Sequence, residues 1–168
     1  MKRVLVTGAN GSIGRALCER MLGENFRVHG AVRPAKASLL PEGVEVAHID
    51  SVDGDTDWKN TLEGVNTVVH LAARVHVMKD SASNPFTEYH KVNVMGSERL
   101  ALTAAACGVK RFIFMSSIKV NGEENIRAYK EEDAPAPKDS YGISKMQAEK
   151  RIKEITADSD NVEQRIVI

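Results

Sequence analysis

The chain has 168 residues, which is the size of one ordinary domain. Hydrophobic residues make up 42% and charged residues 27%, so the composition is globular and excludes an intrinsically disordered chain. The 23 Lys and Arg residues balance 23 Asp and Glu residues, which argues against nucleic acid as the main partner, because no net positive charge attracts a polyanion.

In chain order, short apolar runs alternate with segments of helical spacing, and we expect strands or helices at each of them. Strands separated by helix-length segments are typical of βαβ units and predict an α/β fold: a doubly wound, Rossmann-like parallel sheet between two helix layers. Ligands of such sheets bind beyond the carboxyl ends of the strands, where the strand order reverses. The predicted elements are a strand at Lys2–Val6, a helix at Ser12–Gly23, strands at Phe26–Val32 and Val44–Ile49, a helix at Trp58–Glu63, a strand at Thr67–Leu71, a helix at Phe86–Cys107, a strand at Arg111–Ser116, a helix at Ser140–Ile155 and a strand at Val162–Ile168.

The first predicted strand runs into a glycine-rich turn that leads into a helix. Small residues there let the backbone approach a pyrophosphate, and the N–H groups at the helix start point at it. The alternative is a tight turn that binds nothing, and the spacing matches neither GxGxxG nor a Walker A loop. The candidate phosphate-binding residues are Thr7, Gly8, Asn10, Gly11, Ser12, Ile13 and Gly14.

The ends of the second and third predicted strands bear on which dinucleotide is bound. Dinucleotide folds often place an acid after the second strand to hold the ribose hydroxyls. This sequence has Arg33 there instead, which could face a 2′-phosphate and favours NADP over NAD. Alternatively, Arg33 stacks on adenine or lies in solvent. Asp50 and Ser51 either border the adenine or belong to a plain turn.

Small and hydroxyl-bearing residues follow the fourth and fifth predicted strands. Leu71, Ala72 and Ala73 would let a flat cofactor lie against the backbone, or they are ordinary strand-end packing. Ser116 and Ser117 face the same crevice, or they cap a turn.

Tyr141 and Lys145 are four residues apart, so they share one face of the predicted helix. A phenol is a poor base at neutral pH, but a nearby ammonium favours the phenolate and lowers its pKa. Such a pair can pass a proton to or from an alcohol or a carbonyl oxygen. The same spacing arises by chance in many helices, so the pair gains weight only from the other motifs.

Together these motifs resemble the extended short-chain dehydrogenase/reductases and, more narrowly, the NAD-dependent epimerase/dehydratase family that includes UDP-glucose 4-epimerases. The resemblance implies hydride transfer between a sugar carbon and NAD or NADP, in an epimerase or a 4-keto/4-hydroxy reductase whose substrate is a nucleotide sugar such as a UDP-sugar. The matching segments follow the order of the family and span most of the chain: 7–14, 70–73, 116–122 and 141–145.

The resemblance also assigns roles to residues. The three glycines of the turn would wrap the pyrophosphate. Tyr141 would be the acid/base, Lys145 would lower its pKa and hold the nicotinamide ribose, and Ser117 would hydrogen-bond the reacting oxygen. Asn93 matches a family asparagine that is usually structural. Ile118 and Lys119 stand where the family's 4,6-dehydratases carry an Asp-Glu pair, which disfavours a dehydratase.

Family members continue well past the sixth strand, whereas this sequence ends at Ile168. We therefore expect residues 1–168 to form one dinucleotide-binding domain that lacks most of the substrate segment, with exposed helix faces that favour a homodimer. The alternatives are a catalytically silent dinucleotide-binding domain, or an interaction or sensor protein on the same fold.

Location and metal content are the remaining expectations. The start of the chain lacks the apolar core of a secretory signal, and no stretch approaches the roughly 20 apolar residues of a membrane span, so we expect a cytoplasmic protein without a membrane partner. Cys18 and Cys107 are interpreted as reduced thiols. No metal is expected, because no ligand spacing joins the histidines, which are His29, His48, His70, His76 and His90.

Overall fold

The computed structural model describes residues 1–75, 84–124, 126–159 and 162–167. Six strands form one sheet in the order β3-β2-β1-β4-β5-β6, and all neighbouring strands are parallel. This arrangement confirms the predicted doubly wound sheet. The strands are β1 (Arg3–Thr7), β2 (Arg27–Val32), β3 (Glu45–His48), β4 (Thr67–His70), β5 (Arg111–Met115) and β6 (Glu163–Val167).

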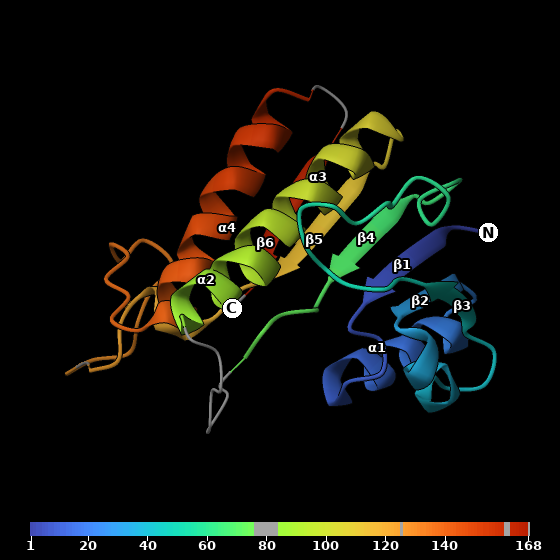
Figure 1. Ribbon diagram of the computed structural model, residues 1–168, viewed down its shortest axis with the longest axis horizontal. Coiled ribbons are helices and arrows are strands. Elements are labelled where there is room, and N and C mark those ends of the chain that lie inside the picture. Colours follow the sequence, from blue (N-terminus) through green and yellow to red (C-terminus); the bar gives the residue numbers. More distant parts are fainter. Residues whose placement is uncertain (76–83, 125, 160–161, 168) are drawn as a thin grey trace.

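Helices cover both faces of the sheet (Figure 1). On one face α1 (Ser12–Gly23) buries Cys18 against alternate β1 residues, among them Val4 and Val6. On the other face α3 (Gly96–Ala106) and α4 (Ser140–Ala157) pack side by side over Leu5 of β1 and the phenyl rings of β5. The alternation along β1 follows from the two-residue period of a strand, which sends successive side chains to opposite faces.

The strand order reverses beside β1, which pairs with β2 on one side and β4 on the other. The carboxyl ends of β1, β4 and β5 are neighbours, because Thr7 pairs with His70 and His70 pairs with Phe114. The segments that follow these three strands therefore meet at one edge, as the sequence predicted.

The predicted helix at Trp58–Glu63 is wrong, because this segment forms consecutive turns. The side chains of Trp58 and Leu62 are fully buried, and Gly64 has a φ of 66°, a left-handed conformation that ends any helix. The segment between the buried side chains of Trp58 and Leu62 is about one helical turn long, which is too short to offset the cost of helix nucleation.

The predicted helix at Phe86–Cys107 is divided into three pieces. A short α2 (Pro85–Tyr89) leads into η2 (His90–Met95), which has π-helical hydrogen bonding, and α3 follows without a break. The wider turn is common near functional sites. The remaining short helices are η1 (Pro34–Leu39) and η3 (Ile118–Val120), both of the 3₁₀ type. His76 and Ile168 lie outside the described residues.

Candidate active site

The turn between β1 and α1 depends on glycine at two positions. Gly8 has a φ of 67°, and the Gly11 N–H donates to its carbonyl at 3.0 Å. A Cβ at Gly14 would lie 2.2 Å from the same carbonyl oxygen, so only glycine allows α1 to start so close to the strand. The helix begins at Ser12 with Gly11 as its N-cap, so its first N–H groups remain available to an anion.

A cavity of about 460 Å³ lies beside this turn, at the reversal of strand order. It brings together residues from the ends of β1, β2, β3 and β4. The predicted cofactor residues that line it are Gly8, Asn10, Arg33, Asp50, Ser51, Ala72 and Ala73. Thr7 is fully buried, and its hydroxyl accepts the N–H groups of Leu71 and Ala72 after β4. Its contact with the cofactor stays a prediction.

The cavity also contains charged residues that the sequence analysis missed. Lys91 of η2 lies 3.9 Å from the Asp53 carboxylate. A hydrogen bond from Ser51, helped by the Asp55 N–H and the Lys91 charge, outweighs burial and lowers the pKa of Asp53. Arg74 and Glu88 are further charged residues of the lining that the sequence analysis missed. Arg74 directly follows the Leu71–Ala73 segment, so that motif could have been extended to it, whereas no spacing signal marks Asp53, Glu88 or Lys91.

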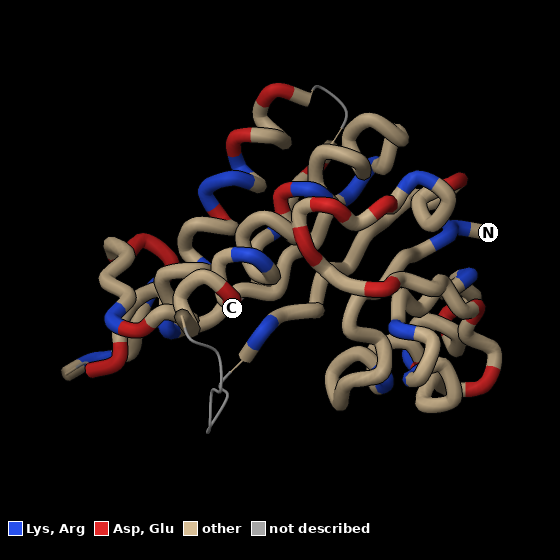
Figure 2. Tube along the Cα trace, in the orientation of Figure 1, with Lys and Arg blue, Asp and Glu red and all other residues tan. Residues whose placement is uncertain are grey.

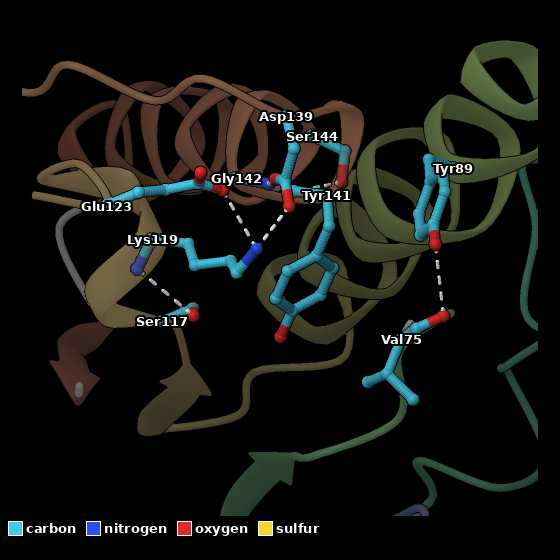
Figure 3. A network of polar contacts seen from close by, with 9 residues as sticks. All are labelled: Val75, Tyr89, Ser117, Lys119, Glu123, Asp139, Tyr141, Gly142 and Ser144. Carbon is cyan, nitrogen blue, oxygen red and sulfur yellow. Dashed lines mark hydrogen bonds and ion pairs between the residues drawn. The ribbon is translucent and has the colours of Figure 1, made fainter. Parts of the chain in front are cut away.

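Tyr141 lies in the first turn of α4, and two contacts fix where this helix starts. The N-cap carboxylate of Asp139 accepts the Gly142 N–H at 2.6 Å. Gly142 packs on the backbone of η3, where an added Cβ would lie 2.7 Å from the Lys119 carbonyl oxygen. These contacts place the Tyr141 phenol beside the Ser117 hydroxyl (Figure 3).

Burial raises the pKa of Tyr141 above its ordinary value. The neighbouring Ser117 hydroxyl and the Lys119 charge oppose that shift, while the Asp139 carboxylate adds to it. The phenol is therefore a neutral proton donor in this structure, held next to a second hydroxyl.

Lys145 follows one turn later on α4 and is almost completely buried. Its ammonium lies 3.9 Å from the centroid of the Phe114 ring, which is a cation–π contact. Burial lowers the pKa of Lys145 to about 7, and Glu149 only partly opposes this. That Lys145 lowers the pKa of Tyr141 stays a prediction, since burial of the phenol outweighs the opposing contributions here.

The two adjacent serines after β5 point to different partners. The Ser116 hydroxyl donates to the Glu149 carboxylate, and its N–H donates to the Val167 carbonyl at 2.6 Å. Ser117 accepts the Lys119 N–H at 3.3 Å and faces Tyr141. Of the two serine hydroxyls, that of Ser117 is therefore the one beside the Tyr141 phenol.

Lys119 is held by carboxylates at the mouth of this site. Its ammonium pairs with Glu123 at 2.9 Å and with Asp139 (Figure 3). Both hydrogen bonds raise the pKa of Lys119. Lys119 occupies one of the two positions compared above with the Asp-Glu pair of the 4,6-dehydratases, and its side chain is a cation and not an acid.

Three further features concern charge, membrane spans and metal ligands. Acidic and basic residues are interspersed along the chain (Figure 2). Within the described ranges, no helix has both the length and the apolar character needed to cross a membrane. In the same part of the chain, no group of three or more His, Cys, Asp or Glu residues is arranged to hold a metal ion.

Comparison with known proteins adds a family and relatives. Residues 4–168 match the model of the NAD dependent epimerase/dehydratase family. The chain is 41% identical over 161 residues to a UDP-glucose 4-epimerase of Vibrio cholerae, which covers 94% of this chain and 48% of that protein. A UDP-arabinose 4-epimerase 1 of Arabidopsis thaliana is 33% identical over 171 residues, covering 94% of this chain and 40% of the relative.

Solved structures agree with that match. MoeE5 in complex with UDP-glucuronic acid and NAD superposes with a TM-score of 0.82 at 29% identity, covering 98% of this chain and 53% of that chain. UDP-glucuronic acid 4-epimerase from Bacillus cereus in complex with NAD gives a TM-score of 0.81 at 25% identity, covering 98% and 55%. The chain thus spans about half the length of the relatives it matches.

Proposed function

The chain belongs to the NAD dependent epimerase/dehydratase family, and from this premise we propose that it binds NAD and takes part in the 4-epimerisation of a UDP-sugar. The observation that carries the proposal is the meeting of Tyr141 and Ser117 near the edge of the sheet where the glycine turn and the cavity lie. The named 4-epimerases among the relatives support the choice of reaction over a simple reductase.

The cofactor residues fit a dinucleotide. The glycine turn and the first N–H groups of α1 would hold the pyrophosphate. The cavity continues from there to Asp50 and Ser51, where the adenine end would lie. We propose NAD as the cofactor, because solved relatives hold NAD, and these relatives give no support to the preference for NADP suggested by Arg33.

In the proposed reaction, side chains of this protein transfer the proton of the sugar hydroxyl. When bound, NAD supplies the hydride acceptor and donor. To act as a base, Tyr141 would have to lose the proton that it carries in this structure, which a nearby Lys145 ammonium would favour. As the phenolate it would take the proton of the sugar hydroxyl as the carbonyl forms, and it would return that proton when the hydroxyl is restored. The Ser117 hydroxyl would hold the same oxygen. Lys145 would contact the nicotinamide ribose, for which it would have to leave the Phe114 ring.

The test combines cofactor titration with turnover. Titration of NAD and NADP by fluorescence measures binding, and conversion of UDP-glucose measures activity. We expect Tyr141→Phe to retain NAD affinity and to lose turnover by about 100-fold or more, the usual contribution of a general acid/base. Tyr129→Phe, which removes the same atom from a loop tyrosine bonded to the Glu124 carbonyl, is the matched control.

Each result separates one reading from another. Absence of NAD and NADP binding by the unaltered chain would rule out the proposal. Full turnover in Tyr141→Phe would rule out the assigned proton transfer. Cofactor binding without conversion of any UDP-sugar would favour the second candidate, a silent dinucleotide-binding domain, which is supported by the half-length match to the relatives. The cytoplasmic location and the homodimer stay predictions.

A further inference from the structure

A chain of buried hydrogen bonds runs from β1 to the helix that carries Tyr141, and its direction can be deduced. The Thr7 hydroxyl oxygen accepts the N–H groups of Leu71 at 3.2 Å and Ala72 at 3.1 Å. Its two lone pairs are then used, so its own proton goes to Nδ1 of His70, 2.6 Å away. Nδ1 of His70 is therefore an acceptor, and the ring proton is on Nε2.

The other side of the His70 ring leads to the same assignment. The Ser97 hydroxyl donates to the Asn93 carbonyl at 2.6 Å, so its oxygen is left to accept. His70 Nε2 lies 2.9 Å from that oxygen and donates to it. Two independent sets of partners thus fix one tautomer of a neutral imidazole. Burial, with Lys145 adding to it, lowers the pKa of His70 to about 3, which agrees with this neutral state.

The chain continues through the side chain of Asn93 on η2. Its amide oxygen accepts the Arg74 N–H at 2.8 Å, and its amide nitrogen donates to the Arg74 carbonyl at 3.0 Å and to the Ser144 hydroxyl at 2.9 Å. The Ser144 hydroxyl in turn donates to the Tyr141 carbonyl at 2.7 Å. The family asparagine, expected to be structural, therefore links the segment after β4 to α4.

Both ends of this chain lie at the candidate site. The segment held by Thr7 is the one that Gly8 approaches most closely, since a Cβ at Gly8 would lie 3.0 Å from the Ala72 nitrogen. The same segment forms part of the cavity wall. The far end is the backbone of Tyr141.

We propose that His70 is a positioning residue, which in its neutral Nε2–H form keeps the Leu71–Ala72 segment against the glycine turn and in register with the helix of Tyr141. This inference rests on the proposed function, because it concerns what holds that site in place. The amide oxygen of glutamine can replace the acceptor Nδ1 of histidine, and the amide nitrogen can replace the donor Nε2. A phenyl ring copies only the shape of the imidazole. Glutamine and phenylalanine at position 70 therefore separate hydrogen bonding from packing.

The first measurement reads the tautomer directly. Nitrogen-15 NMR of histidine-labelled protein without cofactor, with the His70 signals assigned by their absence in His70→Gln, should show Nδ1 bare and Nε2 protonated between about pH 5 and 8. A proton on Nδ1, or a ring that becomes a cation within that range, would overturn the inference. Because no cofactor is present, this result is independent of the proposed function.

The second measurement follows the Leu71 and Ala72 amides by hydrogen exchange. We expect exchange at both to speed up about tenfold or more in His70→Phe and Thr7→Val, and to stay within about threefold in His70→Gln. Thr103→Val, which removes a hydroxyl bonded only within α3, is the matched control and should leave both amides unchanged. NAD affinity should follow the same order of variants.

The outcomes are distinct. Unchanged exchange in His70→Phe would mean that His70 acts by packing alone, and acceleration in His70→Gln as large as in His70→Phe would mean that the two hydrogen bonds do not hold the segment. Either result overturns the inference. Failure of the unaltered chain to bind NAD would refute the proposed function, while the tautomer and the exchange rates would still decide the role of His70.

Discussion

Lys145 has a cost in stability that its proposed role explains. Its pKa falls from 10.5 to about 7 on folding, so the unfolded chain binds more protons across that interval and stability rises with pH there. At or below neutral pH the folded chain thus carries the full desolvation penalty, up to a few kcal/mol at about 1.4 kcal/mol per pKa unit.

Replacing this lysine by a neutral residue of similar shape should therefore stabilise the protein. We expect Lys145→Met to raise the free energy of unfolding by about 1 to 3 kcal/mol at pH 7, with the gain shrinking toward zero as the pH approaches about 10. Urea unfolding followed by circular dichroism measures the gain at pH 7 and its dependence on pH. Lys150→Met, an exposed change on the same helix, should leave the free energy of unfolding nearly unchanged at each pH. A less stable Lys145→Met at pH 7 would contradict the expectation.

Arg33 tests the choice of cofactor at a single side chain. It is exposed at the cavity and follows β2, where a 2′-phosphate would be read. If it faces that position, Arg33→Ala should weaken NADP binding about tenfold, as expected for loss of a charge-assisted hydrogen bond, and leave NAD binding nearly unchanged. Calorimetric titration with both dinucleotides decides this, with Arg20→Ala, paired to Glu24 on α1, as the control. An unchanged ratio of the two affinities would remove Arg33 from this role.

Residues that carry a motif could be proposed from the sequence, whereas residues that reach the cavity only through the fold could not. The glycine turn, Ser117 and Tyr141 stand at fixed offsets from strands or from each other. Asp53 and Lys91 reach the cavity only because the turns after β3 meet η2 in space. No local pattern records such a meeting.

At the scale of elements, the apolar runs predicted the six strands of the sheet, with ends that differ by at most one residue. The periodicity of apolar residues did not predict local structure correctly where tertiary packing determines it. The segment around Trp58 reads as a helix, yet its buried side chains are held by turns. The π turn at His90–Met95 is also missed, because one added residue per turn is indistinguishable from the helical period over so short a stretch.

The contact between α4 and η3 should tolerate no side chain at Gly142. A methyl group there would meet the Lys119 carbonyl oxygen, which is backbone and cannot rotate away. We expect Gly142→Ala to lower the free energy of unfolding by about 1 to 3 kcal/mol, the usual cost of overpacking, despite the better helix propensity of alanine. Gly23→Ala in α1 is the control, because a Cβ added there would meet no atom within 4 Å. This variant should be as stable as the original chain or more stable in the same urea titration. Equal stability of the two variants would refute the close contact.

At the scale of the whole molecule, buried His70 predicts acid sensitivity above the range where carboxylates titrate. Its pKa falls from 6.5 to about 3 on folding, so the unfolded chain takes up the extra proton and stability declines as the pH drops below about 6.5. His29, whose pKa burial also lowers, adds in the same direction.

The His70 share of this decline is separable. The free energy of unfolding of His70→Gln should fall less steeply than that of the original chain between about pH 6.5 and 4.5, because glutamine does not titrate. Urea titrations at several pH values in this window measure the two slopes. Parallel slopes would show that His70 is not held neutral in the folded state.

The topology of the sheet was predictable, because alternating strands and helices joined by right-handed crossovers allow few strand orders. The edge at which the carboxyl ends of the central strands meet follows from that topology. The sequence could not show that one continuous set of hydrogen bonds joins β1, β4, η2 and α4, because the pairs that link different elements are 27 to 63 positions apart.

The π turn ahead of α3 makes the length of this stretch critical. Removing any one residue from His90–Met95 would let the segment close into an ordinary α-helix and would rotate everything after it by about 100°. Ser97 and Leu100, now buried, would swing toward solvent together. Point substitutions on the outer side of this segment should be absorbed far more easily than a single-codon deletion, so natural variation here is expected in residue identity and not in residue count.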